Sequence, residues 1–328
     1  METSVALEQA VSKGAECAEK ILQEMQKKIV GQSHVSRRLL MAMMSQGHVL
    51  LEGLPGLAKT SSITALAKVL DLEFSRVQFT PDLLPADVIG SQIYQPHEGK
   101  FKTRKGPIFT NLLLADEVNR APAKVQSALL EAMAERQVTI GEESWKLAAP
   151  FLVMATQNPI EQEGTYTLPE AQLDRFLFKV QVSYTSLEEE VEIVSRANAG
   201  EEPSLSVVAS SEEIMGLALL QPQIYVAEKV RDYLVRLVFA TRFPGQYGLQ
   251  DLAQKIECGA SPRASIYLEK AARAQAILEG RTFVTPQDVK DIASDVLRHR
   301  VKLSFEAEAE GYSKDLLINS ILNRVEIP

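Results

Sequence analysis

A glycine-rich stretch between an apolar run and a helical pattern carries the residue types that bind phosphate. Its sequence is Gly53-Leu54-Pro55-Gly56-Leu57-Ala58-Lys59-Thr60. Glycines let backbone N–H groups turn toward a phosphate, and the N-terminus of the following helix adds a partial positive charge. We expect Lys59 to reach the β- and γ-phosphates of a nucleotide and the Thr60 hydroxyl to bind Mg²⁺. Ala58 stands where a last glycine is usual, which costs little if residue 58 already lies in the helix. The alternative is a chance Gly-Pro turn.

Acidic and amide side chains follow two other apolar runs. Asp116 and Glu117 come at the end of the run that begins at Leu112. Charged groups at the end of a buried strand are costly without a partner or a task. We therefore expect Asp116 to hold Mg²⁺, directly or through water, and Glu117 to orient and deprotonate the attacking water. Asn158 follows the run 151–155 and is placed to hold that water near the γ-phosphate. A strand that simply emerges into solvent, and an ordinary Asn-Pro turn, are the alternatives.

Two arginines are candidates for contact with the γ-phosphate. Arg175 precedes the last apolar run, and Arg263 opens a helix after Ser261 and Pro262. A guanidinium stabilises the charge that develops on a transferred phosphate, from the same chain or from a neighbour. A surface salt bridge is the alternative for either residue.

The order of the apolar runs predicts an α/β sandwich around a parallel sheet. Most runs are too continuously apolar for a strand with one wet face, so they suit strands covered on both sides. The last run alternates and suits an edge strand. The five runs are His48–Leu51, Phe74–Phe79, Leu112–Ala115, Phe151–Ala155 and Phe178–Tyr184. Ligands of such folds bind at the carboxyl ends of the strands.

Helical signals dominate on both sides of this region. Residues 1–45 have apolar residues at helical spacing. Beyond Tyr184, the pair Ser186 and Glu189 forms a capping box, and further helix starts follow. We expect a nucleotide-binding core over residues 1–184 and a smaller, all-helical lid domain over residues 185–328.

Composition narrows the classes of protein. The chain has 328 residues and a formal net charge of −8 at pH 7, which argues against a general nucleic-acid binder. The basic stretch 100–105 is most simply a solvated loop. No apolar stretch approaches the roughly 18 residues of a membrane span. Cys17 and Cys258 are solitary and suit reduced thiols, so we expect a cytoplasmic protein.

The order of the motifs resembles that of the AAA+ ATPases and, within them, the MoxR family. The resemblance covers essentially the whole chain, and the family commonly has an alanine at the place of Ala58. Its most specific pieces are Ile29-Val30-Gly31-Gln32, Gly53–Thr60, Asp116–Pro122, Ala155–Pro159 and Leu168–Phe176.

The resemblance implies roles in binding ATP and Mg²⁺. Val30, Gly31 and Gln32 would line the adenine pocket. Gly53 to Thr60 would be the Walker A loop. Asp116 and Glu117 would be the Walker B pair, with Thr60 and Asp116 on the metal.

The resemblance also implies how hydrolysis is completed. Asn158 would be sensor 1, and Arg263, on the helical lid, would be sensor 2. Arg175 would be the arginine finger that reaches the nucleotide of the adjacent subunit, and Arg120 could lie at that interface. Because such a site is completed by a neighbour, the resemblance implies a homo-oligomeric ring, commonly a hexamer.

Two insertions and a function complete what the resemblance implies. Residues about 83–106 interrupt the helix between the second and third strands. Residues about 136–147 form a hairpin, in which Trp145 either anchors a client or packs on the core. Both insertions lie where such rings contact client proteins. The implied function is Mg²⁺-dependent ATP hydrolysis that remodels or matures a client, with a separate von Willebrand factor A domain partner. The alternatives are a metal-chelatase or nucleic-acid motor subunit, and a nucleotide-gated scaffold with little turnover.

Overall fold

The chain forms two compact units. The computed structural model describes residues 2–54, 56–159, 166–199 and 203–328. We call the first unit the helical unit; it groups Met1–Ala18, Leu177–Lys179 and Gly216–Pro328. The second, the sheet unit, groups Glu19–Phe176 and Val180–Met215. The domain boundary expected at residue 184 stays a prediction, and residues 185–215 are grouped here with the sheet unit.

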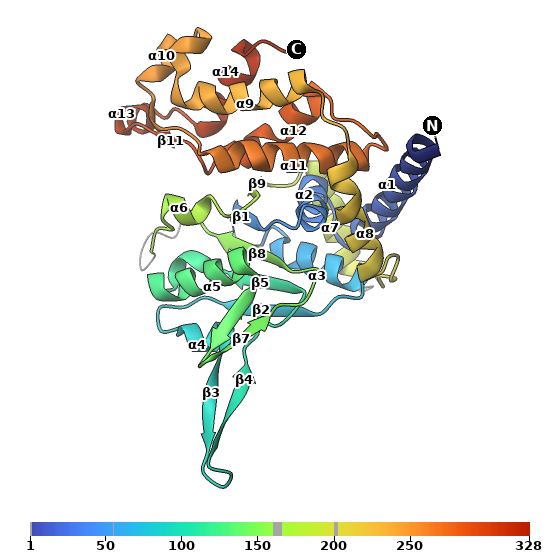
Figure 1. The fold of residues 1–328 in the computed structure, drawn as a ribbon, viewed down its shortest axis with the longest axis vertical. Helices are drawn as coiled ribbons and strands as arrows, with labels where there is room; N and C mark the ends of the chain where they lie inside the picture. Colours follow the sequence, from blue (N-terminus) through green and yellow to red (C-terminus); the bar gives the residue numbers. More distant parts are fainter. Residues whose placement is uncertain (1, 55, 160–165, 200–202) are drawn as a thin grey trace. The chain divides into compact units, whose positions relative to one another are not determined.

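A parallel five-stranded sheet forms the centre of the fold, with the strand order β2-β5-β8-β1-β9. The strands are β1 (Val49–Gly53), β2 (Phe74–Gln78), β5 (Leu112–Asp116), β8 (Leu152–Gln157) and β9 (Phe178–Val182). Each of the five apolar runs thus forms a strand, and the predicted α/β sheet is confirmed (Figure 1).

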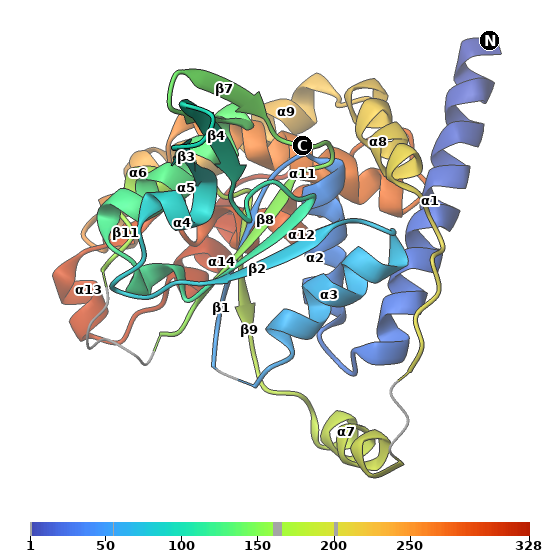
Figure 2. The same cartoon turned by 90° about the horizontal axis from the view of Figure 1, so that it is seen from below.

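Helices cover both faces of the sheet. In β5, Leu113 and Ala115 belong to a buried cluster that includes Leu129 and Met133 of α5 (Ala123–Glu135). The alternate β5 residues point to the other face, because successive side chains of a strand lie on opposite sides. Figures 1 and 2 show α3 (Lys59–Val69) on that side. Coverage of both faces explains why the strands are almost continuously apolar.

The strand register brings polar residues to one edge of the sheet. Asp116 at the end of β5 pairs with Gln78 of β2. Thr156 of β8 pairs with Leu51 of β1. The carboxyl ends of four strands therefore meet where the loop after β1 begins, the usual place for a ligand in a parallel sheet.

The edge strand β9 alternates as its sequence predicts. Phe178, Val180 and Val182 are buried, whereas Gln181 is exposed. Gly53 of β1 lies against this strand, since a Cβ at residue 53 would stand 2.8 Å from the Val182 carbonyl oxygen. A glycine at this position allows the close approach of the two backbones.

The first insertion contains a helix and a hairpin that the sequence did not predict. Residues 83–106 hold the short helix α4 (Pro85–Ile89) and an antiparallel hairpin of β3 (Gly90–Gln95) and β4 (Lys100–Lys105). The basic stretch 100–105 is thus a strand, which corrects its assignment as a loop. Its Lys-Phe-Lys-Thr-Arg pattern has too few apolar residues to indicate a strand.

The second insertion is the predicted hairpin. Strands β6 (Gln137–Ile140) and β7 (Glu143–Lys146) pair in antiparallel register, with Val138 opposite Trp145. Trp145 is partly buried and packs against the apolar cluster below α5. Of the two possibilities for Trp145, the structure favours packing on the core.

Helices make up most of the helical unit. Thr285 begins α12 with a capping box, in which its N–H donates to the Asp288 carboxylate at 2.7 Å. One short antiparallel ladder, β10 (Ile256–Cys258) with β11 (Lys302–Leu303), corrects the expectation that this region is entirely helical. Strands this short leave no periodic signal.

The remaining helices have these bounds: α1 (Glu2–Lys28), α2 (Ser33–Met44), α6 (Glu170–Leu173), α7 (Leu187–Ala199), α8 (Ser211–Leu220), α9 (Glu228–Arg242), α10 (Gln250–Ala253), α11 (Pro262–Leu278), α13 (Phe305–Ala309) and α14 (Lys314–Arg324), with 3-10 turns at Val118–Arg120, Gln221–Gln223 and Pro244–Tyr247. In the described ranges, none of the helices combines the length and the apolar character that crossing a membrane requires.

His48 is buried at the start of β1 with both ring nitrogens engaged. Its Nδ1 accepts the N–H of Val153 at 3.0 Å, and its Nε2 lies 3.1 Å from the carbonyl oxygen of Met133. Since Nδ1 accepts, the proton of the neutral ring sits on Nε2 and is donated to Met133. Burial lowers the pKa of His48 to about 4.

This histidine makes the stability of the fold depend on pH. Unfolded histidine has a pKa of about 6.5, so the unfolded chain binds the proton first as the pH falls. We expect His48 to remove up to about 3 kcal/mol from the free energy of unfolding between about pH 6.5 and about pH 4. In urea titrations, His48→Asn should lack this part of the pH dependence. The matched change His97→Asn, exposed in the turn between β3 and β4, should retain it. An unaltered pH profile in His48→Asn would contradict the assignment.

Candidate functional site

The glycine-rich stretch forms a loop between β1 and α3 with two residues in the left-handed region. Gly56 has a φ of 83°, and Ala58, which caps α3, has a φ of 54°. The helix begins only at Lys59. The condition under which an alanine at residue 58 would cost little is therefore not met, and Ala58 holds a conformation that favours glycine. Pro55 lies outside the described residues.

Lys59 points back into this loop. Its Nζ donates to the carbonyl oxygen of Gly53 at 2.5 Å. Burial lowers the pKa of Lys59, while the nearby carboxylates of Asp116 and Glu117 act in the opposite direction. The Lys59 ammonium group is thus partly desolvated and lies near two carboxylates. Such a cation can also bind a phosphate.

Asp116, at the end of β5, has both carboxylate oxygens engaged. Oδ1 accepts from the Thr156 hydroxyl at 2.6 Å, and Oδ2 lies 2.6 Å from Nη2 of Arg76. The Arg76 side chain is half exposed whereas that of Asp116 is 15% exposed. The arginine is free to move into water at low cost, so Asp116 can exchange it for another cation.

Glu117 is also held in place. Its carboxylate accepts from Nε2 of Gln78 at 2.8 Å and pairs with Nε of Arg120 at 3.0 Å. Its backbone N–H donates to the Thr156 hydroxyl at 2.9 Å. Two donors fix the direction of the carboxylate, which is the requirement for a group that must accept a proton from a positioned water.

A cavity of about 380 Å³ collects the polar residues at the strand ends. Its lining is Gly56, Ala58, Lys59, Thr60, Ser61, Arg76, Gln78, Asp116, Glu117, Thr156 and Asn158. The structure thus brings together the candidate lysine, threonine, two acids and asparagine that the sequence singled out. The sequence missed Arg76, Gln78 and Thr156. The spacing of Arg76 and Gln78 on β2 was the available signal, since residues two apart on a strand share a face.

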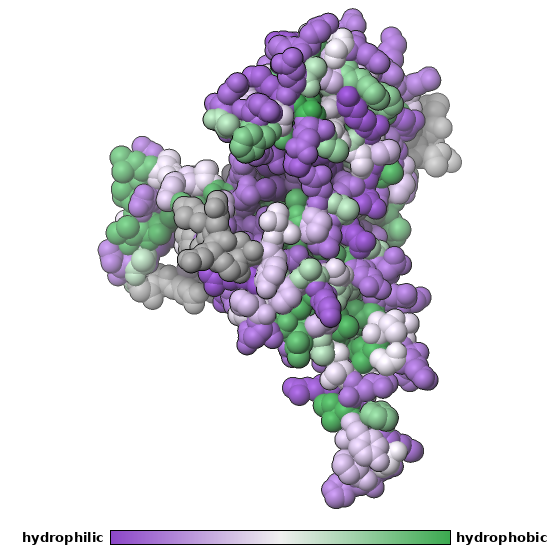
Figure 3. Space-filling view, turned by 90° about the vertical axis from the view of Figure 1, so that its left-hand side faces the viewer, coloured by the Kyte–Doolittle hydropathy of each residue, from purple (hydrophilic) through white to green (hydrophobic). Residues whose placement is uncertain are grey.

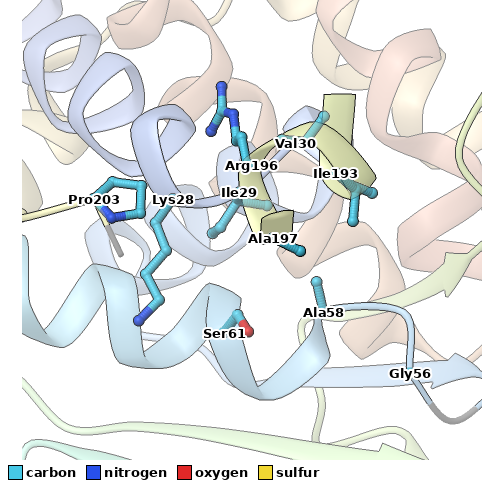
Figure 4. A pocket seen from close by; sticks show the side chains of 10 residues that line it. All are labelled: Lys28, Ile29, Val30, Gly56, Ala58, Ser61, Ile193, Arg196, Ala197 and Pro203. Atoms are coloured by element: carbon cyan, nitrogen blue, oxygen red, sulfur yellow. The ribbon is translucent and has the colours of Figure 1, made fainter. Parts of the chain in front are cut away.

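A second cavity, of about 440 Å³, adjoins the first at the loop (Figure 4). Both cavities are lined by Gly56, Ala58 and Ser61. The other residues of the second cavity are Lys28, Ile29, Val30, Ile193, Arg196, Ala197 and Pro203. Its largely aliphatic walls suit a planar base, while the loop suits the phosphates. The donor set therefore fits a nucleotide.

Helix α7 forms one wall of this second cavity. The sequence placed its residues in the lid, so Ile193 and Ala197 were missed. Val30 lines this cavity, whereas Gly31 and Gln32 are not among its lining residues, and the assignment of all three to an adenine pocket stays a prediction. A Cβ at Gly31 would stand 2.9 Å from Oε2 of Glu189, which shows how closely α7 approaches here.

The two candidate arginines lie in different units. Arg175 follows α6 in the sheet unit, and its Nη1 donates to the carbonyl oxygen of Leu130 at 2.6 Å. Arg263 is exposed in the first turn of α11, in the helical unit. The roles of Arg175 and Arg263 stay predictions.

Comparisons with known proteins agree with this architecture. The chain matches the ATPase family associated with various cellular activities (AAA) over residues 48–178 and the AAA lid domain over residues 250–321. Chaperone MoxR1 of Mycobacterium tuberculosis is 49% identical over 310 residues, which make up 94% of this chain and 82% of that protein. YeaC of Bacillus subtilis is 42% identical over 310 residues, 94% of this chain and 94% of that protein. The solved structure of a candidate ATPase from Cytophaga hutchinsonii has a TM-score of 0.93 and 47% identity, covering 100% of this chain and 99% of that one.

The sheet order, the loop after β1 and these matches define an AAA+ ATPase, an enzyme that hydrolyses ATP. Within that class the chain belongs to the MoxR family. Its role as an ATPase is accordingly chaperone-like.

The conformation of Ala58 predicts a stabilising substitution. An L-residue in the left-handed region costs about 1–2 kcal/mol, and glycine costs about 0.4–1 kcal/mol through the freedom it adds to the unfolded chain. Ala58→Gly should therefore raise the free energy of unfolding by about 1 kcal/mol in denaturant titrations. Lys68→Gly, exposed inside the same helix, should lower it by about 0.5–1 kcal/mol. Equal losses in the two variants would show that residue 58 is helical.

Proposed function

We propose that the cavity at the strand ends binds ATP with Mg²⁺ and carries out its hydrolysis, and that the energy remodels or matures a client protein. The observation that carries this proposal is the convergence of Lys59, Thr60, Asp116, Glu117 and Asn158 on one cavity. These five groups come from three separate segments of the chain, namely the ends of β5 and β8 and the start of α3.

The phosphates would lie along the loop from Gly53 to Thr60. Lys59 would leave the Gly53 carbonyl for the β- and γ-phosphates, because a phosphate is the stronger partner for an ammonium group. Thr60 and Asp116 would hold magnesium, which neutralises phosphate charge when bound. Asp116 would first give up its pair with Arg76.

Glu117 would accept a proton from the attacking water, and Asn158 would orient that water. Asn158 is buried at the end of β8, where it is shielded from bulk solvent. Gln78 and Arg120 keep the Glu117 carboxylate within the cavity. The adenine would lie between Val30 and α7, with Gly31 and Gln32 beside it. Arg263 would act from the lid as sensor 2.

We infer that the chain assembles into a homo-oligomeric ring, with a hexamer as its expected size. The inference rests on Arg175, whose side chain reaches the Leu130 carbonyl of its own α5 rather than the cavity lining. In the ring, Arg175 would reach the nucleotide of the adjacent subunit. We also infer a separate von Willebrand factor A domain partner and a cytoplasmic location.

Two other functions make different demands on the same residues. A metal-chelatase or nucleic-acid motor subunit would use the same cavity, but a net charge of −8 opposes a nucleic-acid track. A nucleotide-gated scaffold with little turnover would not need a carboxylate held for water activation, as Glu117 is.

Mixing two inactive variants tests the site and the ring together. Arg175→Ala should lose hydrolysis while each subunit still binds ATP, and Lys59→Ala should lose nucleotide binding. Mixed rings should regain hydrolysis, because an intact Lys59 pocket then meets an intact Arg175 from its neighbour. An arginine finger contributes roughly 10³–10⁵ in rate, so partial recovery is measurable in a phosphate-release assay.

The matched control is Arg324→Ala, which removes an exposed arginine paired with Asp251 in the helical unit. This variant should hydrolyse ATP at the wild-type rate. If mixtures shown to contain mixed rings stay inactive, Arg175 is a structural residue and the argument for a trans-acting finger is lost.

A further inference from the structure

The hairpin of β3 and β4 presents two chemically different faces. Because paired residues of an antiparallel ladder share a face, the pairs Ile93–Lys102, Gln95–Lys100 and Ser91–Arg104 lie on one side. We call Ile93, Lys100, Lys102 and Arg104 the cationic face. The pairs Tyr94–Phe101 and Gln92–Thr103 lie on the other side.

The second side is partly occupied by the body of the sheet unit. Gln92 lies against Gly141 in the turn of the β6–β7 hairpin, where a Cβ would come within 2.3 Å of its Nε2. Lys105 stacks over Trp145 and Phe109, with Nζ 4.4 Å and 4.8 Å from the two ring centroids. These contacts fix the base of the hairpin, so that the cationic face is turned away from the unit.

Within the described residues, the cationic face lacks an acidic partner. Among the parts of the chain that the structure describes, Lys100, Lys102 and Arg104 form no ion pair, and all but one residue of β4 is exposed. Residues 90–105 hold four cations and a single carboxylate, in a chain with a net charge of −8. Such a local reversal of sign attracts an acidic partner.

An exposed aromatic pair lies on the opposite face of the hairpin, between these cations along the strands. Tyr94 and Phe101 are 52% and 66% exposed, and their ring centroids are 5.2 Å apart. Figure 3 shows this projecting hairpin, at the bottom of the view, with hydrophobic and hydrophilic groups side by side. Exposed aromatic residues beside cations are typical of a contact surface rather than of a solvated loop.

The outer edge of β4 can pair with a strand of a partner. Within the described residues, the β3–β4 sheet has two strands, so the outer edge of β4 has unpaired backbone groups. A strand added there would place every second side chain beside Lys100, Lys102 and Arg104, and the intervening ones beside Phe101 and Thr103.

We propose that this hairpin binds an extended acidic segment of a client protein, by strand addition to β4. The segment has Asp or Glu at alternate positions, and these carboxylates lie beside the cations of β4. The apolar side chain between two of them lies on the opposite side and contacts Phe101. This inference rests on the proposed remodelling of a client and names the chemistry by which the client is recognised. A nucleic acid is disfavoured because the whole chain repels a polyanion.

Fluorescence anisotropy with the full chain tests the proposal. The probe is a labelled peptide with the repeat Glu-Leu-Glu-Ser, compared with Gln-Leu-Gln-Ser, Glu-Ser-Glu-Ser and a labelled oligothymidylate. The wild-type chain should bind the first peptide most tightly. A triple variant, Lys100→Gln with Lys102→Gln and Arg104→Gln, should bind it about tenfold more weakly, since each exposed pair contributes a factor of up to about five. Phe101→Ser should lose the preference for leucine over serine.

The control is a second triple variant that loses the same charge at three exposed positions outside the hairpin: Lys13→Gln, Lys20→Gln and Lys68→Gln. It should bind like the wild type, and circular dichroism should show that both triple variants are folded. Equal weakening in the control, no binding of the acidic peptide, or tighter binding of the oligothymidylate would each overturn the proposal. Because the binding assay needs no ATP turnover, these outcomes say nothing against the hydrolytic site, whereas the ring-mixing experiment tests that site and the ring without involving the hairpin.

Discussion

The structure depends on how charge is balanced in a partly desolvated cavity. Lys59 lies against the Gly53 carbonyl, and burial works against its charge while Asp116 and Glu117 support it. The two acids are held in turn by Arg76 and by Gln78 with Arg120. Every ionised group has a partner that is weaker than a phosphate or a divalent cation would be, so the site is arranged for exchange.

Much of the site was predictable because strand ends carry two signals at once. An apolar run fixes a buried strand, and a polar residue directly after it must lie at the carboxyl edge of the sheet. This is why Lys59, Asp116, Glu117 and Asn158 could be assigned to one place before the sheet order was known. The capping signal at Ser186 was equally local, and the structure forms this capping box with Glu189.

What sequence did not predict depends on contacts between distant segments. Arg76 is an ordinary exposed arginine until the β2–β5 register sets it beside Asp116. Helix α7 belongs by pattern to the helical region, yet Ile193 lines a cavity with Val30. The β3–β4 hairpin lacks an apolar repeat, because its side chains face water rather than a core. Ala58 has no local signal that separates a helix cap from a first helical residue.

The assignment of Lys59 to binding and of Glu117 to water activation is the central claim, and one paired measurement tests it. Binding of a fluorescent ATP analogue and release of phosphate are followed in Glu117→Gln, in Lys59→Ala and in the exposed control Glu135→Gln. Glu117→Gln should bind ATP like the wild type and hydrolyse it roughly 10²–10⁴ times more slowly. Lys59→Ala should not bind ATP, and Glu135→Gln should bind and hydrolyse ATP like the wild type. Hydrolysis at the wild-type rate by Glu117→Gln, or unaltered binding by Lys59→Ala, would contradict the account.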